Sequence, residues 1–333
     1  VIASLSIASI ASRFDRRQVM ATLTALMLAS LVLIALAPNF AFLMVARALL
    51  GLTIGGFWSL STATVVRLVP AASVPKALGI MYMGNAAATA FAAPIGSYLG
   101  GVIGWRGVFW ALVPLALVNL AWQWQSLPSI RSREAIPLGR MLALLRRPQV
   151  AYAMAGVMLT FGGAFTVFTY LRPFLENEVH VTLTELSLLL LGLGAAGFLG
   201  THSATALVGR HVYRLLRGLP WALAVVTVAM LASGRSTAAL AVLMIAWGAL
   251  NSAIPVSWFN WLAKGVADEP EAGGGLMVAG IQLAIMLGAG LGGLLLDHVS
   301  ISATFIGGAV LLMVGSMVVG SGRRLAPFVA SSR

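Results

Sequence analysis

The chain has 333 residues, of which 60% are hydrophobic and only 9% are charged, and it contains no cysteine. A soluble domain carries about 25% charged residues, so this composition excludes a water-soluble globule. The absence of cysteine excludes a secreted scaffold held by disulfides. Long continuous apolar runs are typical of membrane-spanning helices and not of the alternating strands of a barrel. The composition therefore predicts an all-α polytopic membrane protein.

Eleven apolar runs are separated by charged residues or by Pro/Gly breaks. The first run, residues 1–12, is shorter than the roughly 20 residues that a span needs. We interpret it as the second half of a span, and we expect a further helix upstream of this sequence. Ten complete spans are predicted at 19–37, 40–66, 78–103, 107–126, 150–172, 183–208, 218–233, 237–263, 275–296 and 302–321.

Basic residues gather in every second loop between these runs. Of the 21 Lys and Arg residues, 17 lie in such loops, and the positive-inside rule predicts that these loops are cytoplasmic. The central loop and the C-terminus are then on the cytoplasmic side. The net charge of +12 is explained by this topology, and it predicts anionic membrane lipid rather than nucleic acid as a partner.

One connection, residues 127–149, is long, basic and predicted to be cytoplasmic. It divides the chain into an expected N-terminal bundle, residues 1–126, and an expected C-terminal bundle, residues 150–333. With the helix expected upstream, the plan is six spans plus six, which is the two-bundle architecture of a secondary transporter.

Arg47 lies about seven residues inside the span that begins near Phe40. An arginine at the bilayer centre costs at least about 2.5 kcal/mol on insertion scales, so intramembrane charges usually serve function. The alternative is that its long side chain reaches the outer headgroups. No span carries an acidic residue near its middle. The proton acceptor of a proton-coupled carrier is then expected in the upstream helix, or at His202 or Asp297. For His202 we favour the alternative of a structural hydrogen bond to a neighbouring helix.

Aromatic and amide side chains cluster at two places within the spans. Such side chains can stack on a flat heterocycle and hydrogen-bond to its edge, although Trp residues near span ends also form interfacial belts. The residues that we expect to line a substrate cavity are Phe57, Trp58, Asn85, Trp258 and Asn260. Pro94 lies inside a span with Gly96 close by, and a proline there frees a carbonyl group and bends the helix.

Signatures of enzymes are absent: the sequence contains no HExxH, no nucleotide-binding glycine loop, and no loop large enough to be a soluble catalytic domain. We therefore expect a transporter and not an enzyme. An exporter of drugs or sugars is the alternative within this fold, and a membrane-embedded enzyme or signalling protein is the remote alternative.

Three stretches resemble the drug:proton antiporter branch of the major facilitator superfamily. ARALLGLTIGGFW resembles the fourth-helix motif, and it places Arg47 at the arginine implicated in proton coupling. AAPIGSYLGGVIGWRGVFW loosely resembles the antiporter motif around Pro94 and Gly96. SRFDRR resembles the loop motif through Arg13, Asp15, Arg16 and Arg17, but the usual glycines are missing.

Four longer stretches, within 51–70, 74–97, 168–174 and 246–264, resemble the bacterial exporters of purine ribonucleosides in this superfamily. The resemblance implies proton-driven export of nucleosides such as inosine and guanosine by alternating access in the bacterial inner membrane. It implies a monomer without a cofactor or metal, with the proton gradient as the energy source and the nucleoside and protons as partners.

Overall fold

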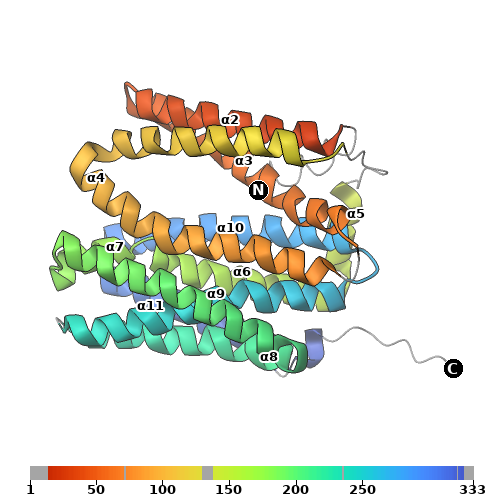
Figure 1. Ribbon diagram of the computed structural model, residues 1–333. Helices are drawn as coiled ribbons and strands as arrows, with labels where there is room; N and C mark the ends of the chain where they lie inside the picture. Colours follow the sequence, from red (N-terminus) through yellow and green to blue (C-terminus); the bar gives the residue numbers. More distant parts are fainter. Residues whose placement is uncertain (1–13, 71–72, 130–137, 235, 321, 326–333) are drawn as a thin grey trace. The chain divides into compact units, whose positions relative to one another are not determined.

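The computed structural model describes residues 14–70, 73–129, 138–234, 236–320 and 322–325 (Figure 1). Within these ranges the chain is helical and contains no extended strand, which confirms the all-α prediction. The elements are α2 (Arg16–Leu36), α3 (Phe40–Leu68), α4 (Val74–Ser126), α5 (Leu138–Ala143), η3 (Leu144–Arg146), α6 (Pro148–Phe168), α7 (Leu171–Phe174), η4 (Leu175–Val179), α8 (Leu183–Ala232), α9 (Thr237–Gly265), α10 (Pro270–His298), α11 (Ile301–Val319) and η5 (Arg323–Leu325).

Eight helices in the described part of the chain are long and apolar enough to cross a membrane. The predicted count of eleven spans is therefore not confirmed, and the partial span at 1–12 lies outside the described residues. The lower count has a local cause. The predicted spans 78–103 and 107–126 both lie within α4. The predicted spans 183–208 and 218–233 both lie within α8.

Both long helices are interrupted where the sequence predicts a loop. Gly104 interrupts α4 with φ 72° and ψ 163°, and His211 interrupts α8 with φ −132° and ψ 28°. A straight helix of 50 residues would be about 75 Å long, far more than the roughly 30 Å of hydrocarbon in a bilayer. In Figure 1 the ribbon of α8 reverses direction within its length. The positive φ of Gly104 explains why a residue without a side chain stands at the first turn.

Contacts divide the chain into two units. Unit 1 consists of residues 1–80, 96–142 and 274–279, and unit 2 consists of residues 81–95, 143–273 and 280–333. The boundary at 142/143 falls inside the central connection predicted at 127–149. The units differ from the predicted bundles in the segments 81–95 and 274–279, and the two-bundle division remains a prediction.

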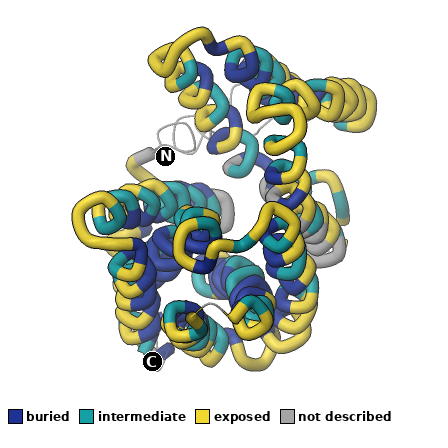
Figure 2. The backbone as a smooth tube through the Cα atoms, turned by 90° about the vertical axis from the view of Figure 1, so that its left-hand side faces the viewer, coloured by how far each residue is buried: buried dark blue, intermediate teal, exposed yellow. Residues whose placement is uncertain are grey.

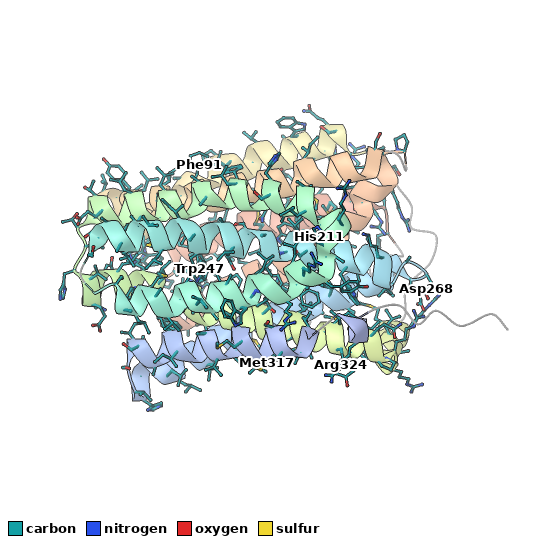
Figure 3. The ribbon with its side chains drawn as sticks, turned by 90° about the horizontal axis from the view of Figure 1, so that it is seen from below. Phe91, His211, Trp247, Asp268, Met317 and Arg324 are labelled. Carbon is teal, nitrogen blue, oxygen red and sulfur yellow. The ribbon has the colours of Figure 1, made fainter. Side chains whose placement is uncertain are left out.

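Unit 2 is held together by close contacts between helices. In it α8 packs along α9, and α11 packs along both α6 and α8. Figure 2 shows the buried residues of this unit on the inward sides of its helices, with exposed residues outside. Trp247, 1% exposed and labelled in Figure 3, stacks on Phe168 with ring centroids 5.9 Å apart. Its indole N–H donates to Thr227 Oγ1 at 3.1 Å, so this buried polar atom is satisfied.

Candidate functional site

One side of α3 is fixed against α2 in unit 1. Ala46, Thr53 and Leu60 follow at intervals of seven residues, which corresponds to one face of a helix, and all are at most 4% exposed. Ser30 on α2 donates a hydrogen bond to the backbone oxygen of Ala46 at 2.8 Å. This face of α3 is therefore the packing face toward α2.

Arg47 lies on a different face of α3 and is exposed. One residue further along a helix turns the side chain by about 100°, which takes Arg47 away from the face that Ala46 occupies. Gly51 and Trp58 follow Arg47 by four and eleven residues, so they project in nearly the same direction. The space beside Gly51 is open, because a Cβ atom built there meets nothing within 4 Å. The structure thus places Arg47 and the half-buried Trp58 on one face of α3.

Phe57 belongs to the packing of unit 1. It is half-buried and packs against the core cluster of Met20, Leu23 and Leu60. Its predicted place in a substrate cavity receives no support from this position, because the ring fills the space between α2 and α3. The sequence did not reveal this, since Phe57 and Trp58 are neighbours in one apolar run.

The residues of the loop motif meet at the start of α2. The Asp15 side chain accepts a hydrogen bond from the backbone N–H of Arg17 at 2.8 Å and thereby caps the helix. The guanidinium of Arg17 lies 4.7 Å from the ring centroid of Trp124 near the end of α4. Arg16 is only 6% exposed and donates to Thr64 Oγ1 on α3 at 3.5 Å. The motif therefore connects α2 to the ends of α3 and α4.

Two further contacts complete this cluster. The Ser129 hydroxyl donates to the Asp15 carboxylate, and Thr24 Oγ1 donates to Gln123 Oε1 at 2.8 Å. Sequence reasoning missed Gln123 and Trp124, whose only signal is that polar and aromatic side chains are frequent at the ends of membrane helices. Arg13, also predicted in this motif, lies outside the described residues.

The predicted substrate residues of α9 have different environments in unit 2. Trp258 is 1% exposed and packs edge-to-face on Trp261, and its ring occupies the space beside Gly156 on α6. This is a packing position, and Trp258 is not among the substrate contacts that we propose. Asn260 is half-buried, and its Oδ1 atom is buried with no hydrogen-bond partner in the described structure. A buried acceptor without a donor loses free energy unless a ligand or water satisfies it.

The remaining predicted residues lie on α4. Asn85 is exposed, Pro94 is buried and Gly96 is half-buried with open space beside it. The residue of α4 with a non-helical backbone is Gly104, ten residues after Pro94. The break in this helix is therefore at Gly104, and the bend expected at Pro94 remains a prediction. Glycine at a positive φ provides a sharper change of direction than a proline within a helix.

His202 and Asp297, the alternative proton acceptors, are both exposed in unit 2. Among the described residues no three His, Asp or Glu side chains gather closely enough to hold a metal ion. The expectation that the protein uses no metal or cofactor remains a prediction.

Two ion pairs join the start of α6 to the connection between α9 and α10. The sequence did not reveal them. Arg147 lies 2.8 Å from Asp268 Oδ2 and 2.9 Å from Glu269 Oε1. Figure 3 shows Asp268 at the ends of the helices. The hydrogen bond from Arg147 lowers the pKa of the Asp268 carboxyl below its ordinary value. The sequence signal was weak, because charged residues in loops usually remain solvated.

Replacing Asp268 with asparagine should slightly lower the thermal stability at pH 7. A lowered pKa in the folded state stabilises the protein above the ordinary aspartate pKa of about 3.9, and this contribution disappears as the pH falls through the lowered value. The effect should be below about 1 kcal/mol because the pair is partly exposed. Unfolding of detergent-solubilised protein, followed by circular dichroism from pH 7 to pH 3, measures it. Asp297→Asn is the control, and a difference that grows toward acid pH would contradict the assignment.

The apolar helices, the charged loop cluster and an exposed arginine inside an apolar helix define a multi-pass membrane transporter. The comparisons with known proteins give the family: the sequence pattern of the Major Facilitator Superfamily matches residues 1–274. The chain belongs to the Major Facilitator Superfamily, and it is a transporter and not an enzyme.

The chain is also similar to individual relatives and, in fold, to a solved structure. The chain is 36% identical over 327 residues to the purine ribonucleoside efflux pump NepI of Salmonella enteritidis PT4, covering 98% of this chain and 82% of the relative. It is 44% identical over 322 residues to the transcription regulatory protein OpdE of Pseudomonas aeruginosa, covering 96% and 80%. The fold is similar to that of the Major Facilitator Superfamily transporter FucP in its outward conformation, with a TM-score of 0.68 at 14% identity, covering 96% of this chain and 86% of FucP.

Proposed function

We propose that this protein exports purine ribonucleosides, such as inosine and guanosine, across the bacterial inner membrane in exchange for protons. Transport proceeds by alternating access of a central site to the two sides of the membrane. The observation that carries this proposal is the 36% identity to NepI over nearly the whole chain. The central connection and the C-terminus are on the cytoplasmic side, because most basic residues lie in the corresponding loops.

Three residues are proposed for the mechanism. Arg47 keeps a positive charge on an exposed face of α3 and influences the affinity of the proton site through that charge. Trp58, on the same face of α3, offers a ring on which a purine can stack. Asn260 supplies a buried carbonyl oxygen without a partner, which can accept a hydrogen bond from a base amino group or a ribose hydroxyl.

Uptake into inverted membrane vesicles tests the substrate and the coupling together. Full-length protein should accumulate radiolabelled inosine when the vesicle interior is acidic, and unlabelled guanosine should compete, whereas a sugar or an apolar drug should not. Asn260→Ala should raise the KM for inosine about tenfold, the effect of removing one hydrogen bond to substrate. Asn260→Gln, which keeps the amide, should recover part of this loss. Uptake that ignores the pH gradient would refute proton coupling.

A second candidate follows from the name of another relative. OpdE, which is 44% identical to this chain, is named a transcription regulatory protein. This name favours a second candidate function for the present protein, a regulatory role in the membrane. This candidate predicts binding of a small molecule without net uptake into vesicles. Binding of labelled inosine in detergent together with absent uptake would favour regulation over export.

A further inference from the structure

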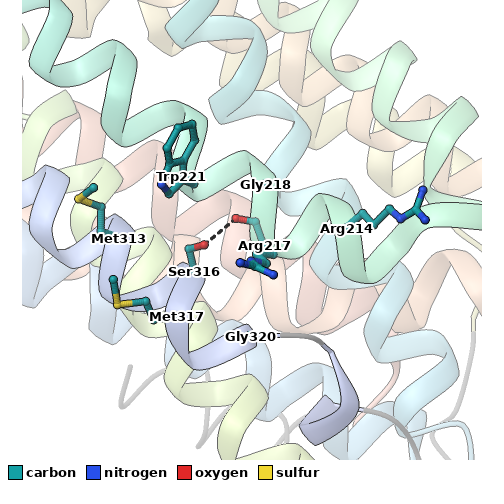
Figure 4. Close-up of a pocket in the computed structure, with 8 residues that line it drawn as sticks. All are labelled: Arg214, Arg217, Gly218, Trp221, Met313, Ser316, Met317 and Gly320. Carbon is teal, nitrogen blue, oxygen red and sulfur yellow. Dashed lines mark hydrogen bonds between the residues drawn. The ribbon is translucent and has the colours of Figure 1, made fainter.

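A cleft of about 620 Å³ lies between the second part of α8 and the end of α11, entirely within unit 2 (Figure 4). Arg214, Arg217 and Trp221 line it from α8, and Met313 and Met317 line it from α11. In Figure 4 the two methionines and Trp221 lie toward one end of the cleft, and the arginines lie toward the other. The cleft therefore has an apolar end and a cationic end.

The walls of this cleft are held together by contacts of their own. Ser316 on α11 donates a hydrogen bond from Oγ to the backbone oxygen of Arg217 at 2.8 Å. Beyond α11, Gly322 adopts φ 78°, and a Cβ atom there would lie 2.7 Å from the Tyr213 side chain. The chain after α11 thus packs closely against α8, and this packing requires glycine at that position.

The charge in the cleft is uncompensated. Arg214 and Arg217 are both exposed, and in the described part of the chain neither guanidinium lies within ion-pairing distance of a carboxylate. By contrast, Arg147 of this unit binds two acidic residues and Arg172 binds Glu176. The two free guanidinium groups offer several N–H donors to an anion, and guanidinium geometry matches phosphate oxygens in particular.

The cleft lies where two apolar helices end, which is the level at which we expect lipid headgroups. It lies next to the break of α8 at His211 and next to the end of α11 at Val319, where two apolar helices end. Trp221 is 55% exposed and Met317 is 72% exposed, so both offer apolar surface to the surrounding lipid. Tryptophan and arginine at this depth are typical of the boundary between hydrocarbon and headgroups.

We propose that this cleft binds one anionic phospholipid. The lipid phosphate accepts hydrogen bonds from Arg217 and Arg214, and the acyl chains lie along Trp221, Met313 and Met317. A free phosphate ion would leave the apolar wall of the cleft without a partner. A zwitterionic lipid would bring a third cation next to the two arginines. Basic pockets between membrane helices bind anionic lipid headgroups, and this cleft combines such a basic end with an apolar wall for the acyl chains.

Native mass spectrometry of the full-length protein in detergent, titrated with phosphatidylglycerol, tests this site. Arg214→Gln/Arg217→Gln should bind the lipid at least about tenfold more weakly, as the loss of one charge-assisted hydrogen bond already predicts. Arg146→Gln/Arg210→Gln, which removes two exposed arginines outside the cleft, is the matched control and should bind as the original protein does.

A second variant tests the cleft without changing its charge. Gly218 lines the cleft, and a Cβ atom there meets nothing within 4 Å, so Gly218→Leu fills the space without a backbone clash. Lipid binding should fall at least about tenfold here as well. Equal binding by all variants, equal binding of phosphatidylcholine, or full displacement by inorganic phosphate at the lipid's own concentration would each overturn the proposal.

Discussion

Replacing Arg47 with alanine should reduce proton-driven accumulation of nucleoside to the background of empty vesicles, while the protein still inserts and folds. The exposed guanidinium lies away from the packing face of α3, so its loss removes no contact between α2 and α3. A neighbouring positive charge favours the deprotonated form of a proton acceptor, so its removal makes the acceptor hold its proton more tightly. A loss of about 1.36 kcal/mol of interaction changes the affinity of the acceptor for its proton tenfold, which disturbs its cycle of binding and release.

Two transport modes separate coupling from binding in this variant. Accumulation against a gradient needs proton movement, whereas exchange of labelled for unlabelled inosine across the membrane needs only substrate binding and alternating access. We expect Arg47→Ala to lose accumulation and to keep exchange. Arg47→Lys, which retains the charge, should restore part of the accumulation.

A control on the same helix excludes a general disturbance. Val45 is 71% exposed on α3 and carries no charge, so Val45→Ala should transport normally. Accumulation by Arg47→Ala at the rate of the original protein would remove this arginine from the mechanism. Simultaneous loss of accumulation and exchange, with normal membrane levels, would show that Arg47 acts in substrate binding.

Replacing Gly200 with alanine should destabilise the protein by about 2 kcal/mol or more. A Cβ atom on Gly200 would overlap the backbone carbonyl of Ala249, and one on Gly248 would overlap that of Leu193. The helices α8 and α9 thus approach each other closely at reciprocal glycines, the small-residue packing that is common between membrane helices. Backbone atoms cannot move aside as a flexible side chain can, so the helices must separate and lose contacts.

Gly209→Ala is the matched control on the same helix. Nothing lies within 4 Å of a Cβ atom at Gly209, so this variant should gain the helix propensity of alanine over glycine, about 1 kcal/mol. The same gain applies at Gly200, where the clash outweighs it. Thermal unfolding in detergent, together with the amount of monodisperse protein, compares the two. A Gly200→Ala protein as stable as Gly209→Ala would show that α8 and α9 do not approach closely at this glycine.

The sequence was sufficient to predict the helical segments and the position of Arg47. Membrane helices must satisfy their backbone groups internally, so a span appears in the sequence as a continuous apolar run. A charge inside such a run is conspicuous for the same reason. The turns at Gly104 and His211 fall in predicted loops, and at each turn one helical segment follows the other almost directly.

The faces of the helices could not be predicted in this way. Phe57 and Trp58 are neighbours in the sequence, but Phe57 packs against the core of unit 1 and Trp58 shares a face with Arg47. Trp258 fills space beside Gly156, whereas Asn260, two residues later, has an unsatisfied oxygen. In a soluble helix, polar residues mark the outward face, but these helices are apolar on every side.

The sequence alone determined that this protein lies in the membrane and that Arg47 is an exceptional charge within an apolar helix, because both follow from transferring side chains and backbone from water into hydrocarbon. Only the tertiary structure decided which aromatic residues pack between helices, that Arg147 binds two acidic residues, and that Arg217 and Met317 share one cleft. Apolar side chains pack equally well against lipid and against a neighbouring helix. Hydrophobicity therefore cannot tell which face of a helix contacts lipid and which contacts another helix, and only the tertiary packing decides this.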